Sequence, residues 1–369
     1  MKRLFIILAA IILSGVLIFN GCAKEAPAPA PAPVPAPAPA PAPAPAQPIK
    51  IVFSSNEPPM SWLATDVMMP WIASIEQATG GAIKVEPHWG GELAESSEAY
   101  DAVASGIADM GDPKPTELPT RFPLTGVLTM NSYDVMCYKR SLVYWELYQK
   151  YPEMQAEYKD TKVLWLYDQT FGCFATTNKA LRTLADCQGI KMLGVGEWIA
   201  EREKALGMVP VSMAPMDMMP GLQKGVLDGC TIAPFLLRDF QMGAFLKYVT
   251  DVSCSMTPWA FVVNLNTWEK IPANLQKIME DVSMQQMNMV DELYMKMTAD
   301  RLGSAPEEFG IEVINLPADE KAKWAALDVK VRDDFVKDLE SKGLPGQKIF
   351  ADFLALEKKY SAAEYAPKQ

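Results

Sequence analysis

The amino-acid sequence predicts an α/β protein whose folded part has two lobes and a long connecting helix. Short strand-like runs alternate with helical segments after residue 47, as they do in open α/β sheets. Residues 48–369 are long enough for two lobes of ordinary size. Residues 273–302 contain neither proline nor glycine and are amphipathic, which predicts one helix long enough to run along both lobes.

The first lobe is expected to begin with a strand at 51–53. A helix follows and ends at the glycine stop of 79–81. Residues 82–87 alternate between apolar and polar side chains, which is typical of a strand. A helix at 95–106 then leads into a short strand at 107–111.

The second lobe shows the same alternation. Apolar runs at 163–167, 171–176 and 189–193 predict three strands. Helices are expected at 199–206 and 220–225. These segments give the second lobe a build similar to that of the first.

Two later segments are expected to tie the lobes together. A strand at 259–264 returns to the first lobe, and the long helix follows it. The apolar residues of this helix that fall near helical spacing are Ile278, Val282, Met289, Leu293 and Met297. The predicted division is 48–170 plus 258–298 for lobe I, and 171–257 plus 299–369 for lobe II.

The N-terminus has the pattern of an export signal. Lys2 and Arg3 precede an apolar run that ends at Phe19, and this run is short for a membrane span of roughly 20 residues. Residues 19–22 resemble a lipobox, although Phe19 stands where leucine is more usual. We therefore expect 1–21 to be a lipoprotein signal peptide and Cys22 to be lipidated; the alternative is an uncleaved membrane anchor.

Residues 22–47 follow as a stem of nearly pure Ala-Pro alternation. Proline fixes φ and lacks a backbone donor, so this segment is expected to form a polyproline-II spacer at about 3.1 Å per residue. The stem has nothing to bury and cannot form a core. Lipid and stem together would hold the lobes outside the cytoplasm at a membrane surface.

Composition excludes several function classes. The net charge of −11 argues against nucleic acid or an anionic membrane surface as a partner, since both require a basic footprint. His88 is the only histidine, and no nucleophile motif, metal-ligand spacing or phosphate-binding loop is present, so we expect no catalysis, no cofactor and no metal. Mostly structural roles are expected for the remaining cysteines, Cys137, Cys173, Cys187, Cys230 and Cys254.

Four segments in order, at 100–110, 178–191, 222–229 and 268–277, resemble those of TRAP transporter solute-binding proteins, the DctP-like family. This resemblance implies a periplasmic-binding-protein-like clamp of two lobes with a hinge. It also implies that a small organic ligand is enclosed between the lobes and handed to TRAP permease subunits in the membrane. An alternative with the same clamp is a sensor subunit that presents its ligand state to a membrane receptor.

The sequence departs from the family where a carboxylate would be held. Leu193 stands in place of the usual ligand-binding arginine, and Cys173 in place of a second, less regular one. A substitute cation would have to come from Lys191, Arg202 or Arg238, none of which is at the matching position. The simpler expectation is a less charged, more apolar or aromatic ligand.

The candidate ligand-binding residues combine aromatic walls with a few polar groups on segments that converge on the family's cleft. For each there is a structural alternative: His88 forms a local hydrogen bond, the acids are solvated, and Met216 fills the core. The candidates are Trp62, His88, Trp89, Glu95, Asp112, Phe171, Cys173, Leu193, Trp198, Met216, Phe235 and Trp259.

Overall fold

The computed structural model describes residues 47–130, 133, 135–169, 172–194, 196–213, 217–252 and 257–366. The predicted signal peptide, Cys22, almost all of the stem, and the candidates Phe171 and Met216 lie outside these residues. Within them, no helix combines the length and the apolar character that crossing a bilayer requires.

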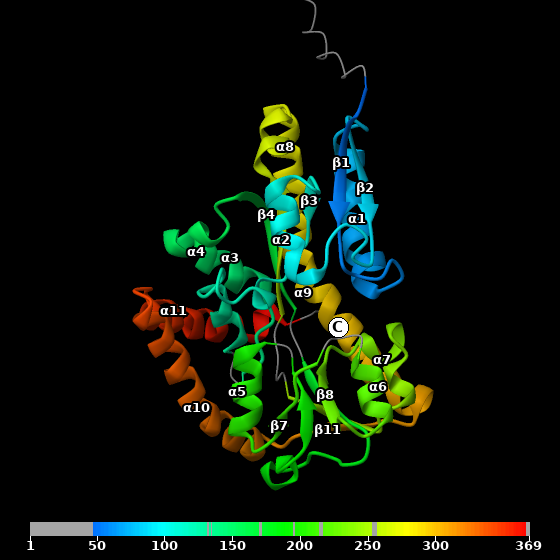
Figure 1. Ribbon diagram of the computed structural model, residues 1–369, viewed down its shortest axis with the longest axis vertical. Helices are drawn as coiled ribbons and strands as arrows, with labels where there is room; N and C mark the ends of the chain where they lie inside the picture. The colour runs from blue at the N-terminus through cyan, green and yellow to red at the C-terminus, as the bar shows by residue number, and fades with distance from the viewer. Residues whose placement is uncertain are drawn as a thin grey trace, which may run out of the picture. The chain divides into compact units, whose positions relative to one another are not determined.

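The first sheet has the strand order β2-β1-β3-β10-β4 (Figure 1). Strands β1, β2 and β3 are parallel, while β10 is antiparallel to both β3 and β4. Nearly every residue of β4 and β10 is buried, which explains why their sequences are almost continuously apolar. The strands are β1 Ile49–Ser54, β2 Ile83–His88, β3 Met110–Gly111, β4 Thr161–Gln169 and β10 Thr257–Asn264.

The second sheet has the strand order β11-β9-β5-β8-β6-β7. Strand β5 lies antiparallel to its neighbours β8 and β9, and β6 runs parallel to β8. The strands are β5 Cys173–Thr176, β6 Lys191–Leu193, β7 Val209–Pro210, β8 Gly229–Ile232, β9 Tyr248–Asp251 and β11 Glu312–Asn315.

The shorter helices cover the two sheets. The helices predicted at 199–206 and 220–225 correspond to α5 and α6, each shifted by about two residues. A π-helical turn at Leu63–Met68 precedes α1. The helices are α1 Met69–Ala78, α2 Ala99–Ser105, α3 Arg140–Lys150, α4 Pro152–Glu157, α5 Glu197–Ala205, α6 Met218–Gln223, α7 Leu236–Asp239 and α8 Leu265–Lys270.

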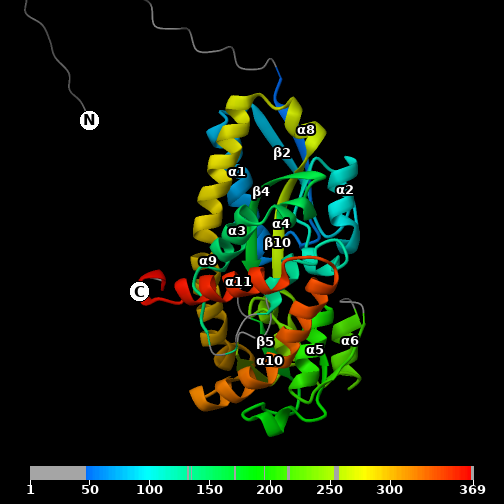
Figure 2. The same ribbon diagram turned by 90° about the vertical axis from the view of Figure 1, so that its left-hand side faces the viewer.

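The chain passes between the lobes four times, the last time through α10 (Ala318–Ser341). It leaves the first sheet at the end of β4, Gln169, and enters the second at the start of β5, Cys173. It returns between the end of β9 and the start of β10, so the predicted return strand does join the first sheet. Helix α9, Ala273–Phe309, then runs along both lobes (Figure 2).

The buried face of α9 includes only some of the apolar residues at helical spacing. Met297 is buried, whereas Met289 and Leu293 are 51% and 37% exposed. The buried stripe includes polar residues that find partners: Ser283 accepts a 3.0 Å hydrogen bond from Trp71 Nε1, and Asp291 accepts one of 2.8 Å from Ser141 Oγ. Apolar spacing alone could not identify this face. Its apolar members are Leu275, Met279, Met287, Val290, Tyr294, Met297 and Ala305.

The C-terminal helices depart from the predicted boundary, which assigned all of 299–369 to lobe II. In the structure, Trp324 of α10 (Ala318–Ser341) packs with Phe174 of the second lobe, whereas Phe335 joins the core of the first. Helix α11 (Gly346–Lys359) packs wholly with the first lobe through Ile349 and Phe353, and it lies across the middle of Figure 2. Helix α10 is therefore a further link between the lobes.

Candidate functional site

The facing edges of the two sheets define the candidate site. Ser55 and Asp112 follow β1 and β3, and Gln169 ends β4, so these residues reach the same edge of the first sheet. The second sheet presents the end of β8 and the start of β5 to the connecting segments. Ligands of open α/β sheets bind beyond the carboxyl ends of parallel strands, which is where these two edges meet.

A charged cluster lies at the first of these edges. The ammonium of Lys114 is 3.3 Å from Glu57 Oε1 and 4.3 Å from the centre of the Trp259 ring. Ser55 Oγ donates a 2.8 Å hydrogen bond to Asp112 Oδ2 and accepts one from the Glu57 backbone N–H. Two of the predicted residues, Asp112 and Trp259, are thus brought together, around a lysine that was not predicted.

Burial shifts the pKa values of the charged groups in this cluster. Asp112 is 3% exposed, and this burial raises its pKa well above the ordinary value, with the Glu57 charge acting in the same direction. Burial opposes the charge of Lys114, but Glu57 and Glu117 hold its pKa above the ordinary value. Lys114 is therefore protonated, and its charge is already matched by Glu57.

Aromatic side chains continue from this cluster toward the second lobe. Trp259 Nε1 donates to Gln169 Oε1 at 3.3 Å, and Gln169 Nε2 donates to the Tyr294 hydroxyl at 3.4 Å. The Tyr294 ring centre lies 5.6 Å from that of Trp62 and 6.3 Å from that of Tyr167. Trp62, Tyr167 and Tyr294 therefore form a buried aromatic cluster, which Gln169 links to Trp259 through hydrogen bonds.

Trp62 also makes a direct contact between the lobes. Its backbone N–H donates a 2.7 Å hydrogen bond to Asp239 Oδ2 at the end of α7. Its ring centre lies 6.4 Å from that of Phe235, and both side chains are buried. Two predicted residues from opposite lobes therefore pack together in this structure.

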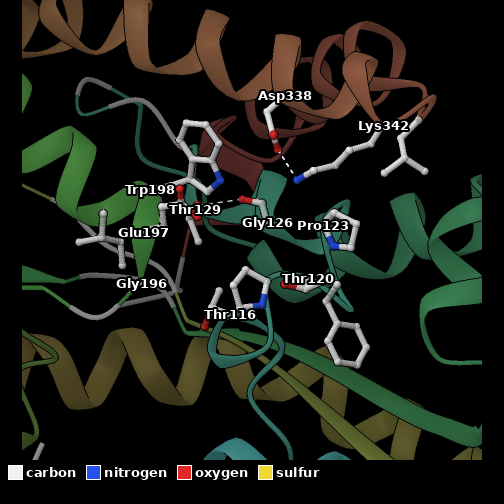
Figure 3. A pocket seen from close by; sticks show the side chains of 14 residues that line it. Thr116, Thr120, Pro123, Gly126, Thr129, Gly196, Glu197, Trp198, Asp338 and Lys342 are labelled. Atoms are coloured by element: carbon white, nitrogen blue, oxygen red, sulfur yellow. Dashed lines mark hydrogen bonds and ion pairs between the residues drawn. The ribbon is translucent and has the colours of Figure 1, made fainter. Parts of the chain in front are cut away.

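A cavity of about 630 Å³ lies between the lobes. One of its walls follows the charged cluster closely in sequence, but no residue of that cluster lines the cavity. Its walls come from loops at 116–129 of the first lobe, from the start of α5 and from the end of α10 (Figure 3). The predicted residue Trp198 lines it and meets Phe335 edge-on, with ring centres 5.2 Å apart. The Asp338–Lys342 ion pair also lines this cavity.

Other predicted residues make contacts typical of structural roles. His88 Nδ1 is 3.1 Å from Glu92, and Trp89 packs edge-on against Phe53 with ring centres 5.9 Å apart. Glu95 is exposed. Cys173 and Leu193 lie buried in the core of the second lobe, in one hydrophobic cluster that also contains Leu222, Leu227 and Ile232.

The substitute cations suggested by the sequence are engaged elsewhere. Arg202 Nε donates to Asp328 at 2.9 Å, Arg238 is ion-paired with Glu308, and Lys191 Nζ donates to the Gly225 carbonyl at 2.7 Å. Every arginine in the described ranges takes part in an ion pair with a carboxylate. The remaining ones are Arg121, Arg140, Arg182, Arg301 and Arg332.

Sequence reasoning missed Lys114, Glu57 and Gln169. The substitute cations expected from the sequence all lie in lobe II, whereas Lys114 follows a two-residue strand of the first sheet. Its partner Glu57 is 57 positions earlier in the chain. The signal in the sequence is the position of Asp112-Pro113-Lys114 directly after a strand, because Asp112 is itself a candidate ligand-binding residue.

The described cysteines are buried and unbridged: Cys137, Cys173, Cys187 and Cys230. Burial raises the pKa of Cys137, Cys187 and Cys230 to about 12, so these thiols are poor nucleophiles at neutral pH. Cys173 Sγ lies 3.9 Å from Asp251 Oδ1. In the part of the chain that the structure covers, no group of acidic, histidine or cysteine residues is arranged to hold a metal ion.

Comparisons with family models and with known sequences both match extracellular solute-binding proteins. The family model DctP, "Bacterial extracellular solute-binding protein, family 7", matches residues 53–338. The C4-dicarboxylate-binding periplasmic protein DctP of Rhodobacter capsulatus is 24% identical over 282 residues, which are 74% of this chain and 82% of the relative.

Solved structures share the fold. A TRAP solute-binding protein from Rhodoferax ferrireducens, in complex with copurified benzoate, matches with a TM-score of 0.79 and 21% identity over 85% of this chain and 98% of its own. A marine metagenome TRAP solute-binding protein specific for aromatic acid ligands, in complex with 3-hydroxybenzoate, has the same TM-score and identity, over 86% of this chain and 100% of its own.

Proposed function

Because the chain belongs to the DctP family of bacterial extracellular solute-binding proteins, family 7, we propose that it captures an aromatic small molecule between its lobes and delivers it to a TRAP permease. The observation that carries the ligand class is the aromatic pair of Trp62 and Tyr294, linked through Gln169 to Trp259, beside an ion pair in which Lys114 is already matched by Glu57. Aromatic rings offer flat apolar surfaces for such a ligand.

The ligands described for the relatives support an aromatic ring in the ligand. The groups that would bind the polar end of such a ligand are arranged differently in this chain. Solved relatives are described with benzoate, with 3-hydroxybenzoate and with mandelate. In this chain the described arginines are all ion-paired, so a bidentate guanidinium clamp on a carboxylate would require one of these pairs to break. The protein holds its ligand without transforming it, which agrees with a sequence that lacks a catalytic set.

Ligand capture is expected to make residues 48–369 more compact when these are produced without signal and stem. A ligand that binds only the closed form shifts the population toward that form by its difference in affinity. Small-angle scattering should show a smaller radius of gyration after addition of the molecule that copurifies and is identified by native mass spectrometry. An unchanged radius with proven binding would contradict the clamp.

On the same proposal, Cys22 bears a diacylglycerol and the Ala-Pro stem keeps the lobes near the membrane. Cys22→Ser should abolish labelling by a fatty-acid probe and leave the signal peptide uncleaved, because the thiol is the acceptor. The matched variant Cys137→Ser changes a buried thiol of the folded lobes and should leave labelling intact. Labelling that persists in Cys22→Ser would rule out the lipid anchor.

A further inference from the structure

Arg202 belongs to α5 of the second lobe, but its hydrogen bonds reach outside that lobe. Its Nη1 donates a 2.6 Å hydrogen bond to the backbone carbonyl of Thr129 in the first lobe, and its Nε donates one of 2.9 Å to Asp328 Oδ1 of α10. Helices α5 and α10 lie side by side (Figure 1, Figure 2). The Arg202 side chain is 1% exposed, so one buried guanidinium joins both lobes and the helix that links them.

Further charges connect Arg202 to the place where the chain first leaves lobe I. Asp328 Oδ2 lies 3.2 Å from Arg332 Nε. Burial raises the pKa of Glu357 on α11 to about 7, whereas the charges of three arginines act to lower it. Arg140 pairs with Glu357 and with Asp168, which is next to the end of β4. A row of alternating charges therefore spans the two lobes: Arg202, Asp328, Arg332, Glu357, Arg140 and Asp168.

The cavity of about 630 Å³ between the lobes adjoins the Arg202 contact. Thr129 lines it from lobe I, Trp198 lines it from the turn of α5 before Arg202, and Asp338 lines it from α10 (Figure 3). The elements that Arg202 joins are therefore the same ones that form the walls of the cavity. Protein interiors are otherwise close-packed, so this space gives α5 room to turn relative to the loop at 116–129.

A second contact between the lobes is held less firmly. The Trp62 N–H donates to Asp239, whose side chain is only partly buried, so water can replace this hydrogen bond when the lobes part. Arg202 and Thr129 are both buried. Their separation would leave a buried donor and a buried carbonyl unpaired, which is costly. Movement of the lobes should therefore break the Trp62–Asp239 contact before the Arg202–Thr129 contact.

We infer that Arg202 is the pivot of the clamp: its contacts with Thr129 and Asp328 persist while lobe II turns about them. This inference rests on the proposed function, because it assigns a positioning role in capture to a residue that does not touch the ligand. The pivot limits the ligand-free protein to a narrow range of angles between the lobes. Fewer open conformations mean that less conformational entropy is lost when the clamp closes.

Distances between two nitroxide labels test the pivot without any ligand. The labels are attached through a genetically encoded ketone amino acid at two exposed positions, Lys84 in lobe I and Lys224 in lobe II, so the native cysteines stay unlabelled. In residues 48–369, Arg202→Met should widen the distribution of distances and extend it to longer values, because α5 is no longer held to Thr129. Double electron–electron resonance measures this distribution.

Two further variants and a second label pair separate a pivot from a general loss of structure. Arg202→Lys keeps the charge but not the planar fork, so it should give an intermediate width, and it decides alone should Arg202→Met not fold. Arg182→Met removes a 53% exposed arginine that pairs with Glu312 within lobe II and should match the parent. Labels at Lys84 and Lys159, both exposed in lobe I, should give the parent distribution in every variant.

Three outcomes overturn the inference. An unchanged distribution between Lys84 and Lys224 in the Arg202 variants would show that Arg202 does not hold the lobes together in the ligand-free form. Equal broadening in Arg182→Met, or broadening of the label pair within lobe I, would show a general loss of structure. The proposed capture function fails separately, if the copurified molecule causes no compaction in the scattering experiment. The two failures remain distinguishable because the label distances are measured without ligand.

Discussion

Arg140→Met is expected to lower the free energy of unfolding by about 3–5 kcal/mol, because it removes one side of a buried ion network. Arg140 is fully buried and pairs with Asp168 at 2.7 Å and with Glu357 at 2.5 Å. Its guanidinium also donates to the Leu128 carbonyl at 2.6 Å. The variant would leave two buried carboxyl groups without their cation. Urea denaturation at pH 7 measures the loss.

The pH dependence gives this prediction a second readout. Burial raises the pKa of Asp168 to about 6 and that of Glu357 to about 7, even with Arg140 present. A carboxyl group with a raised folded-state pKa holds its proton longer in the folded state than in the unfolded one. Its contribution to stability is therefore lost as pH rises from about 4 through the folded-state pKa. Without Arg140, stability should fall more steeply from pH 5 to 8.

The matched control is Arg121→Met. Arg121 also pairs with two carboxylates, Asp101 and Asp160, but its side chain is 33% exposed and solvent screens the pairs. Exposed ion pairs contribute about 0–1 kcal/mol, so this variant should remain close to the parent protein. Equal losses in the two variants, or a flat pH profile for Arg140→Met, would contradict the assigned role of the buried network.

Much of the fold could be predicted because the periodicity of apolar residues in strands and helices depends on the local sequence alone. The parallel strands β1 and β2, the return of β10 and the existence of α9 all follow from such patterns. The packing face of α9 could not be predicted, because Ser283 and Asp291 are buried through partners far away in sequence. The position of α11 could not be predicted either, because it depends on the ion pair between Glu357 and Arg140.

The candidate site was harder to predict than the fold. Aromatic candidates such as Trp259, Trp62 and Phe235 could be selected because large aromatic rings near the ends of strands tend to be buried. Lys114 acquires its place only through contacts with Glu57 and the Trp259 ring, which no spacing rule connects. Charges are the least predictable part of a site, because their effect depends on every neighbour within several ångströms.

Asp239→Ala is expected to weaken closure of the clamp and to lower ligand affinity. Asp239 in lobe II accepts a 2.7 Å hydrogen bond from the Trp62 backbone in lobe I. A hydrogen bond to a charged group contributes about 1.5–3 kcal/mol, which corresponds to roughly ten- to a hundredfold in affinity if the contact exists only in the closed form. Calorimetry with the copurified ligand measures the change.

The role of Asp239 in closing the clamp predicts how the radius of gyration and the ligand concentration needed for compaction should change. Because Asp239 binds lobe I and not the ligand, its loss should leave the ligand-free radius of gyration unchanged or larger and raise the ligand concentration needed for compaction. Asp239→Asn keeps an acceptor oxygen without charge and should give an intermediate effect. Asp300→Ala changes the exposed acid that also pairs with Arg301 and should have little effect. Full affinity in Asp239→Ala would show that the Trp62–Asp239 contact does not stabilise the closed form.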